Sequence, residues 1–472
     1  MANTTTSTVA FSILSPDASL SYDRIKLRLK KYRTLHASDS DTIELSTENG
    51  KTVICRKQAN EMEKYMDRAE ILLRDVVQSR DIPTITVLNH LRDLTKVLDN
   101  LKLYDECRLT GNCALDLAEA LGRRSLKFRY EQAETLSLIA GLSVYQPRAR
   151  TLFVHAVSIC EEVVGIDASH SNKHRLLTVL SRAGSRNSDR LGTQWLGHAI
   201  QLMTKEISPT VVDPHFRSAI YYNYGNRLRH LKQNSDALEA YHKALSVCRR
   251  LANNDPAKYT PHVARTLMNM GLALGDIGKY DDAIVAYKEV LEICTTMSTQ
   301  DPPRYNELMA KTLLNYGNTL GSLNQVSEAA LIAKQAISLL RKLAQTGNER
   351  TNLLGIAFHS YGSHCASLGQ HAEAMLAYQE SLLQHPLAAT DSGAEKHLML
   401  TLHNIAHSSR ALGKYAEANT AATEFLERNH GRVLEICHYA PEFSRCFVCQ
   451  RGITPDSLHD VSPPFPPTAS CG

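Results

Sequence analysis

Apolar and small residues recur at three- and four-residue steps from about residue 61 to 430, which is the spacing of one face of an α-helix. Near residue 270 this pattern predicts two helices joined by a short turn at 278–281. The apolar face of the first helix carries Leu267, Met270, Gly271, Leu274 and Ile277, and that of the second carries Ala283, Ile284, Tyr287, Val290 and Leu291. The pattern therefore predicts an antiparallel helix pair that needs neighbours to cover its apolar faces.

The same helix pair is repeated at a fixed spacing. Five small-residue markers recur at intervals of 44 to 46 residues, at Tyr224-Gly225, Met270-Gly271, Tyr316-Gly317, Tyr361-Gly362 and Ile405-Ala406. Each is followed twelve residues later by an alanine, at Ala237, Ala283, Ala329, Ala374 and Ala418. Small residues let paired helices approach closely, and a bulky residue there would cost roughly 1–3 kcal/mol. A fixed period of this size predicts stacked helix pairs.

Fainter copies of the frame continue upstream. The second-helix markers Cys107, Ala149, Gly192 and Ala237 are 42, 43 and 45 residues apart. This regularity predicts about eight helix pairs in all. A separate helical domain over 61–205 is the alternative, and the sequence leaves both interpretations open.

The frame resembles the tetratricopeptide repeat family. Gly225, Ala237, Tyr241 and Ala244 match the family's pattern of a glycine, an alanine, an aromatic residue and a small residue. The repeats that begin at Gly271 and Gly362 match it nearly as well, and those that begin at Gly317 and Ala406 keep only part of it. The unit is longer than the usual one and its closing proline is shifted into an Asp-Pro linker. Both departures are similar to the long-repeat variety of kinesin light chain and fungal multi-repeat proteins. The resemblance implies an all-α, right-handed α-solenoid of antiparallel helix pairs.

In such a solenoid the first helix of each pair lines a concave groove, where a peptide or helix of another protein is expected to bind. Asparagine stands two positions before the marker in four of the five clear repeats. Amide groups donate and accept hydrogen bonds, which suits a peptide backbone, and nearby cations favour an acidic or carboxylate-bearing partner. The candidate groove residues are Asn223, Asn226, Arg265, Asn269, Lys311, Asn315, Asn318, His359, His403 and Asn404.

Two other interpretations of this pattern stay open. The asparagines could form hydrogen bonds only within their own repeats. The chain could also act as a sensor or autoinhibitory array beside a separate signalling domain, as long repeats of this kind do in fungi. We expect a noncatalytic scaffold in either case, because no phosphate-binding loop, His-Glu-x2-His motif or Gly-x-Ser-x-Gly elbow is present in the sequence. No cofactor is expected.

Composition and charge exclude several classes of partner and cellular location. The net charge of +4 and the scattered Lys and Arg argue against a nucleic-acid partner. No apolar run approaches the ~18–20 residues that span a bilayer, and the Thr-rich N-terminus does not resemble a secretion signal. We therefore expect a cytoplasmic protein, with a nuclear one not excluded, and no membrane partner. Eleven cysteines in such a chain predict reduced thiols. The oligomeric state is not determined by the sequence.

The two ends differ from the repeats. Residues 1–60 form an N-terminal extension, in which Asn49-Gly50 between β-prone runs predicts a hairpin over 42–55. Degenerate repeats are assigned to 61–205 and well-marked repeats to 206–430. Residues 431–472 form a Pro-rich tail with a cysteine cluster at Cys437, His438, Cys446 and Cys449. A zinc site needs two close ligand pairs and only one is present, so we expect ordinary thiols and no metal, with zinc left open.

Overall fold

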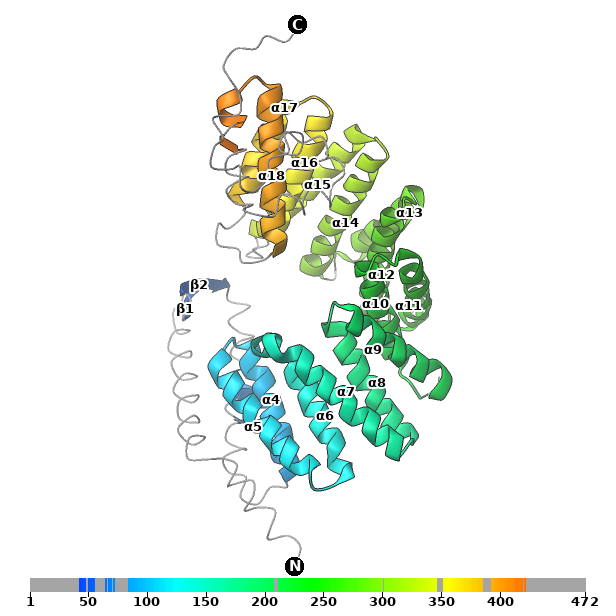
Figure 1. Ribbon diagram of the computed structural model, residues 1–472. Coiled ribbons are helices and arrows are strands. Elements are labelled where there is room, and N and C mark those ends of the chain that lie inside the picture. Colours follow the sequence, from blue (N-terminus) through cyan, green and yellow to red (C-terminus); the bar gives the residue numbers. More distant parts are fainter. Residues whose placement is uncertain are drawn as a thin grey trace, which may run out of the picture. The chain divides into compact units, whose positions relative to one another are not determined.

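The computed structural model describes residues 42–47, 50–55, 64–65, 67–69, 71–72, 84–207, 211–299, 301–345, 351–384, 392–418 and 420–421. The tail at 431–472, with its cysteine cluster, lies outside these residues. The chain divides into two compact units, Met1–Asn254 (unit 1) and Asp255–Gly472 (unit 2). Each unit consists of helices stacked side by side (Figure 1). No helix in the described part of the chain is long and apolar enough to cross a membrane.

The described residues of unit 1 form four helix pairs, two short helical segments, a hairpin and helical residues at 64–65, 67–69 and 71–72. The pairs are α4 (Thr84–Asn100) with α5 (Tyr104–Gly122), α6 (Leu126–Ala140) with α7 (Ala149–Ile166), α8 (His170–Arg186) with α9 (Arg190–Gln201), and α10 (Pro214–His230) with α11 (Asn234–Asn254). The segments are η2 (Ser143–Arg148) and η3 (Leu202–Glu206). The hairpin pairs β1 (Thr42–Thr47) with β2 (Gly50–Cys55) in antiparallel register, from Thr42 opposite Cys55 to Thr47 opposite Gly50.

Unit 2 continues the same arrangement. Its pairs are α12 (Pro256–Asp276) with α13 (Tyr280–Met297), α14 (Pro302–Ser322) with α15 (Val326–Gln345), and α16 (Thr351–Ser367) with α17 (His371–Leu383). Helix α18 (Ser392–Ala411) begins a further pair, and residues 415–418 and 420–421 after it are helical. The predicted fold class, an all-α solenoid of antiparallel helix pairs, is confirmed. The domain boundaries assigned at 60, 205 and 430 remain predictions.

The second-helix markers lie in the first turn of their helices in the described pairs of unit 1. Cys107, Ala149 and Gly192 lie in the first turns of α5, α7 and α9, as Ala237 does in α11. Cys107 and Ala237 are fully buried, and the two in between are buried. The assignment of 61–205 to degenerate repeats stays a prediction, and buried markers in these three pairs are consistent with it.

Glycine in the first helix makes room for a tyrosine of the second helix, sixteen residues later. A Cβ added at Gly271 would lie 2.5 Å from Cε1 of Tyr287, and one added at Gly225 would lie 2.6 Å from Cε1 of Tyr241. Both rings are essentially inaccessible to solvent, at 1% and 0% exposure. Gly362 and Tyr378 repeat the arrangement at 2.7 Å. In these three repeats the glycine predicted from the sequence therefore lets the tyrosine ring of the second helix pack directly on the backbone of the first helix.

Three Asp-Pro steps start first helices instead of ending second ones. The carboxylates of Asp213, Asp255 and Asp301 each accept a hydrogen bond from a backbone N–H three residues later, at 2.8, 3.1 and 3.4 Å. The proline that follows each aspartate occupies the first helical position, where its missing N–H costs nothing. The Asp-Pro linker noted in the sequence therefore caps α10, α12 and α14.

The turn inside most pairs has one residue in the left-handed region. This residue stands five positions before the second-helix marker, and is Lys102, Lys232, Gly278, Asn324, Gly369 or Gly413, with φ between 58° and 78°. In the third of these turns the backbone N–H of Lys279 then donates to the carbonyl of Leu274. Glycine adopts this conformation without strain, whereas lysine pays roughly 1–2 kcal/mol.

We expect Lys232→Gly to stabilise the protein by about 0.5–1 kcal/mol, because the released strain exceeds the added entropy of the unfolded chain. Lys279→Gly is the matched control, since Lys279 has φ of −82° and gains nothing from glycine. Chemical denaturation monitored by circular dichroism measures both. A stability gain in Lys279→Gly, or none in Lys232→Gly, would contradict the strain argument.

Candidate functional site

The first helices of each unit form a continuous surface. Within unit 2, α12 packs on α14, α14 on α16 and α16 on α18, and unit 1 has the same succession from α4 to α10. Successive second helices make weaker contacts among the described residues. The closer spacing of the first helices places them on the inner side of each stack. We call the exposed side of α12, α14, α16 and α18 the inner surface of unit 2.

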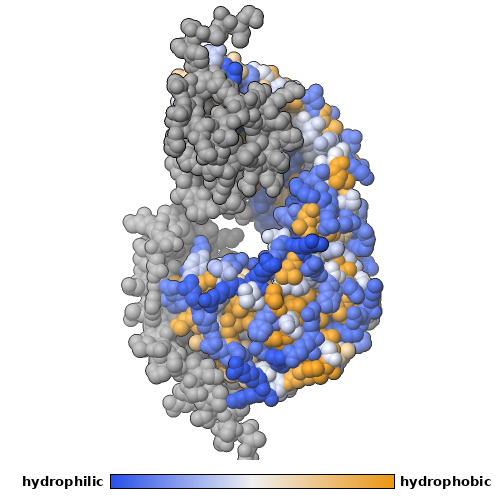
Figure 2. Space-filling model, in the orientation of Figure 1, coloured by the Kyte–Doolittle hydropathy of each residue, from blue (hydrophilic) through white to orange (hydrophobic). Residues whose placement is uncertain are grey.

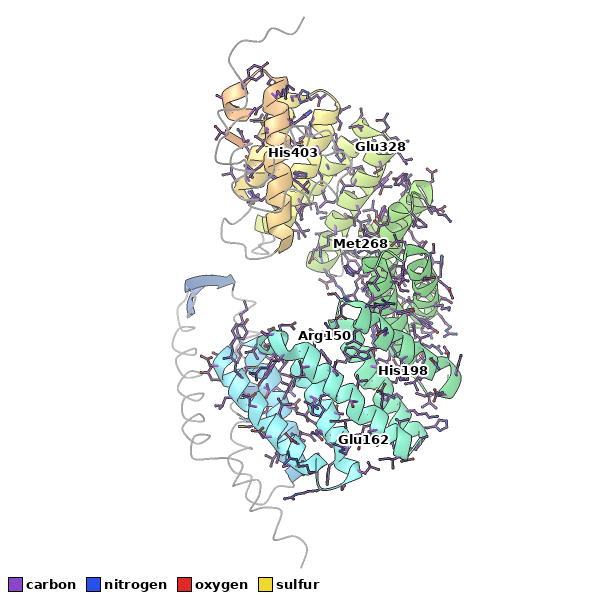
Figure 3. The ribbon with its side chains drawn as sticks, in the orientation of Figure 1. Arg150, Glu162, His198, Met268, Glu328 and His403 are labelled. Atoms are coloured by element: carbon purple, nitrogen blue, oxygen red, sulfur yellow. The ribbon has the colours of Figure 1, made fainter. Side chains whose placement is uncertain are left out.

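Eight of the ten candidate groove residues lie on these four helices, and two lie on α10 of unit 1. Helix α12 carries Arg265 and Asn269, α14 carries Lys311, Asn315 and Asn318, α16 carries His359, α18 carries His403 and Asn404, and α10 carries Asn223 and Asn226. Arg265 and Asn318 are exposed and the others are half-buried. The side chain of His403 is labelled on α18 in Figure 3.

The cations of this surface have partners on their own helices. The ammonium of Lys311 lies 2.6 Å from a carboxylate oxygen of Glu307, one turn earlier on α14. The guanidinium of Arg265 lies 3.1 Å from Nδ1 of His262. Because Glu307 matches the charge of Lys311, the inner surface of unit 2 is less basic than the sequence indicates.

Polar contacts join α16 to α18. Nδ1 of His359 lies 2.9 Å from the hydroxyl of Thr401, and the ring of His359 lies 5.7 Å from that of Tyr378. The amide of Asn404 donates to the hydroxyl of Ser363 at 3.2 Å. His359 and Asn404 therefore link neighbouring repeats as well as facing the inner surface.

The asparagines divide into two groups by their contacts. Oδ1 of Asn226 accepts a hydrogen bond of 2.8 Å from the hydroxyl of Tyr241, so this residue helps to hold the packed ring within its own pair. The side chains of Asn223 and Asn315 form no hydrogen bond with another described residue, and both are half-buried. Asn315 thus offers both a donor and an acceptor to a ligand from the middle of unit 2.

Burial and the neighbouring His407 lower the pKa of His403 from 6.5 to about 4. The folded state therefore holds this imidazole neutral over a range in which the unfolded chain binds a proton. Its contribution to stability is complete above pH 6.5 and is lost as the pH falls toward 4.

We expect His403→Gln to flatten the pH dependence of unfolding between pH 6.5 and 4, because one proton-linked group is removed. Thermal melts of the wild type and the variant at matched pH values measure the difference. Equal slopes for the two proteins would contradict the assignment.

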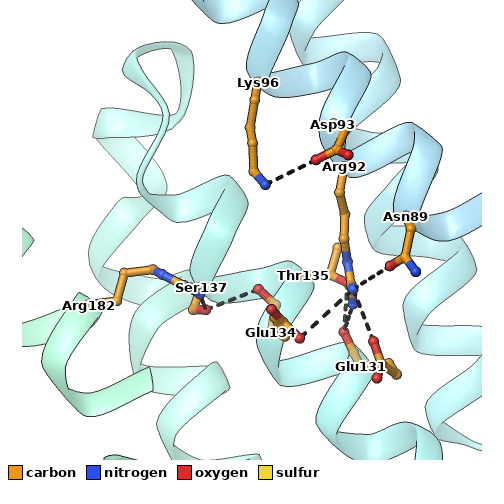
Figure 4. A network of polar contacts seen from close by, with 9 residues as sticks. All are labelled: Asn89, Arg92, Asp93, Lys96, Glu131, Glu134, Thr135, Ser137 and Arg182. Carbon is orange, nitrogen blue, oxygen red and sulfur yellow. Dashed lines mark hydrogen bonds and ion pairs between the residues drawn. The ribbon is translucent and has the colours of Figure 1, made fainter. Parts of the chain in front are cut away.

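Unit 1 has a polar network that the sequence pattern did not reveal (Figure 4). Arg92 of α4 is 6% exposed, and its guanidinium donates to the hydroxyl of Thr135 at 2.8 Å and to the carboxylate of Glu131 at 3.0 Å, both on α6. Further along, Arg182 of α8 donates to the hydroxyl of Ser137. These bonds connect three consecutive first helices, and burial lowers the pKa of Arg182.

The described cysteines serve as packing residues. No disulfide joins the described cysteines, and all except Cys113 are buried; they are Cys107, Cys113, Cys160, Cys248, Cys294 and Cys365. Burial raises the pKa of Cys107, Cys160 and Cys294 to about 12, so these thiols stay protonated at neutral pH. The described residues contain no cluster of three or more His, Cys, Asp or Glu side chains that could hold a metal ion.

Stacked helix pairs with small residues at their closest approach define this molecule as an all-α repeat protein. Residues 216–296, from α10 to α13, match the family model of the tetratricopeptide repeat. The resemblance to tetratricopeptide repeats, inferred from the Gly-to-Ala frame, is therefore confirmed. A search of curated proteins found no match.

Several solved structures are similar to this chain. The apo form of RapI is 11% identical, with a TM-score of 0.52 over 77% of this chain and 95% of that one, and shows the same fold. A putative kinesin light chain of Podosopora anserina, described by its nearly identical repeats, is 14% identical, with a TM-score of 0.36 over 47% and 98%. BtubC of P. vanneervenii is 15% identical, with a TM-score of 0.40 over 53% and 90%.

Proposed function

We propose that the protein is a noncatalytic scaffold that binds a peptide or helix of another protein on the inner surface of unit 2. Tetratricopeptide repeats are in general protein-interaction modules, and residues 216–296 match that family. The observation that carries the proposal is the asparagine at one register on three of the four first helices of unit 2, at Asn269, Asn315 and Asn404, with Ser360 at that register on α16. Asn315 keeps its amide available among the described residues.

The spacing of these asparagines suits an extended ligand. Packed helices lie about 8–10 Å apart. An extended peptide advances about 3.3 Å per residue. Each first helix would therefore meet every third residue of the peptide. An amide that donates and accepts can satisfy the N–H and C=O groups of such a backbone regardless of its side chains.

Charge gives the ligand a direction. Arg265 is exposed on α12, and Lys311 of α14 lies beside Glu307. An acidic or carboxylate-bearing end of the ligand would then lie over α12, and its neutral part over α14 and α16. Such a scaffold would act in the cytoplasm, where its thiols stay reduced.

We expect the double variant Asn269→Ala/Asn315→Ala to lose binding by roughly tenfold or more, because two hydrogen bonds to the ligand are removed. Quantitative copurification identifies the partner, and titration of the purified pair measures the loss. Asn253→Ala/Asn254→Ala, at exposed positions at the end of α11, is the matched control. Unchanged binding in the first variant would contradict the groove and favour the sensor array as the alternative.

A further inference from the structure

The second helices of unit 2 expose a row of aliphatic side chains on the side away from the inner surface. Val285 on α13, Leu331 on α15 and Leu376 on α17 are 66%, 57% and 61% exposed. Each stands two residues after the buried alanine marker of its helix, so the three occupy one repeat position. Exposed apolar residues scattered singly need no explanation, but a periodic row of them indicates a contact surface. Figure 2 shows that apolar side chains also lie among polar ones on the surface of the unit 1 helices.

A groove runs between α15 and α17. One hollow of about 570 Å³ has Phe358 and Tyr361 of α16 at its lining, together with Leu376. A second hollow of about 590 Å³ shares Lys334, Tyr361 and Glu373 with the first and extends to Leu412. The two together form a continuous groove with an aromatic lining from α16.

The two walls of this groove have opposite charge. Helix α15 carries Lys334, Arg341 and Lys342 on its side, and α17 carries Glu373 and Glu380. Lys334 lies 5.0 Å from the ring of Tyr361, and Arg341 lies 5.1 Å from the ring of Phe358. Neither cation has a carboxylate within 4.0 Å among the described residues.

We propose that this surface binds a second copy of the chain, with α15 of one copy on α17 of the other. A two-fold axis along the groove brings the basic wall of each copy onto the acidic wall of its partner, which is the self-complementarity that an isologous dimer requires. The partner then covers Leu376 at the lining of the groove and the exposed Leu331 of α15, while the charges of the two walls pair across the axis. Any ligand of this groove needs an acidic side facing α15 and a basic side facing α17. A second copy, rotated about the two-fold axis, presents these two sides in that order.

The dimer leaves the inner surfaces uncovered, because it uses the second helices and, of α16, only the residues that line the groove. Sedimentation velocity of the full chain from about 1 to about 100 µM is expected to show monomer converting to dimer. Leu331→Glu replaces an exposed apolar side chain that the partner would cover with a charge, and it is expected to leave only monomer. Val154→Glu, at a 46% exposed position of α7, is the control and is expected to dimerise as the wild type does.

A charge exchange tests the two-fold geometry itself. Lys334→Glu/Arg341→Glu makes α15 acidic, and Glu373→Lys/Glu380→Lys makes α17 basic. Each variant alone faces like charges across the axis and is expected to be monomeric. An equimolar mixture pairs opposite charges on both sides and is expected to form a heterodimer, which also shows that both variants are folded.

Three results would overturn the proposal. They are a wild type that is monomeric throughout the range, a dimer that survives Leu331→Glu, and a mixture of the charge variants that stays monomeric. The wild type could also stay monomeric and bind a different protein in the groove, with that binding lost in Leu331→Glu. This result would overturn the dimer and identify that protein as the partner.

Discussion

Gly271→Ala is expected to destabilise the protein by about 1–3 kcal/mol, whereas Gly317→Ala is expected to leave it unchanged or stabilise it by up to about 1 kcal/mol. A Cβ at Gly271 would lie 2.5 Å from the buried ring of Tyr287. The residue equivalent to that tyrosine in the next repeat is Ala333, and a Cβ at Gly317 meets nothing closer than the carbonyl of Ala329 at 3.4 Å. The ring then has to move in one variant and nothing has to move in the other.

Comparing Gly271→Ala with Gly317→Ala cancels the gain in helix propensity that both substitutions share. Alanine is a better helix former than glycine by about 1 kcal/mol, and both glycines lie inside long first helices. The difference between the two variants in urea denaturation therefore reports the packing against the ring alone. Equal shifts in both would show that the glycine is needed for some reason other than the tyrosine.

The second large effect is expected at Arg92. Arg92→Leu should destabilise unit 1 by about 3 kcal/mol, because it removes the cation from a buried site and leaves Glu131 and Thr135 of α6 without their donor. Hydrogen exchange followed by mass spectrometry should show faster exchange in α4 and α6.

Lys96→Ala is the matched control on the same helix. Lys96 lies 3.2 Å from Asp93, and both side chains are at least 40% exposed. Exposed pairs of this kind contribute about 0–1 kcal/mol, so little change is expected. Similar hydrogen-exchange rates in Arg92→Leu and Lys96→Ala would show that the buried contacts of Arg92 stabilise unit 1 no more than an exposed ion pair does.

The repeat frame could be predicted from the sequence because its cause is local. Gly225, Ala237 and Tyr241 lie within one pair, and helical spacing places them in contact. The pairing of Lys311 with Glu307 could also have been found, since the two are four residues apart on one helix. The prediction of an acidic partner considered the cations of the groove alone and so did not take the neighbouring Glu307 into account.

Other features depend on contacts that linear spacing does not reveal. Arg92 and Thr135 are 43 residues apart, and nothing in the periodic pattern distinguishes this arginine from an exposed one. The left-handed conformation of Lys232 was likewise hidden, because lysine gives no turn signal where glycine at position 278 does. Partner contacts of the asparagines are not fixed by the fold, and these residues remain predictions.

Hydrogen bonds between successive first helices recur at about one repeat length. Arg92 reaches Thr135, Arg227 reaches the carbonyl of Ser185, and His359 reaches Thr401, at separations of 43, 42 and 42 residues. A pulling force that straightens either unit separates its first helices and so loads these bonds directly. Each bond joins only neighbouring repeats, so stretching should break the bonds one repeat at a time. The length of each unit should therefore increase in discrete steps of one repeat.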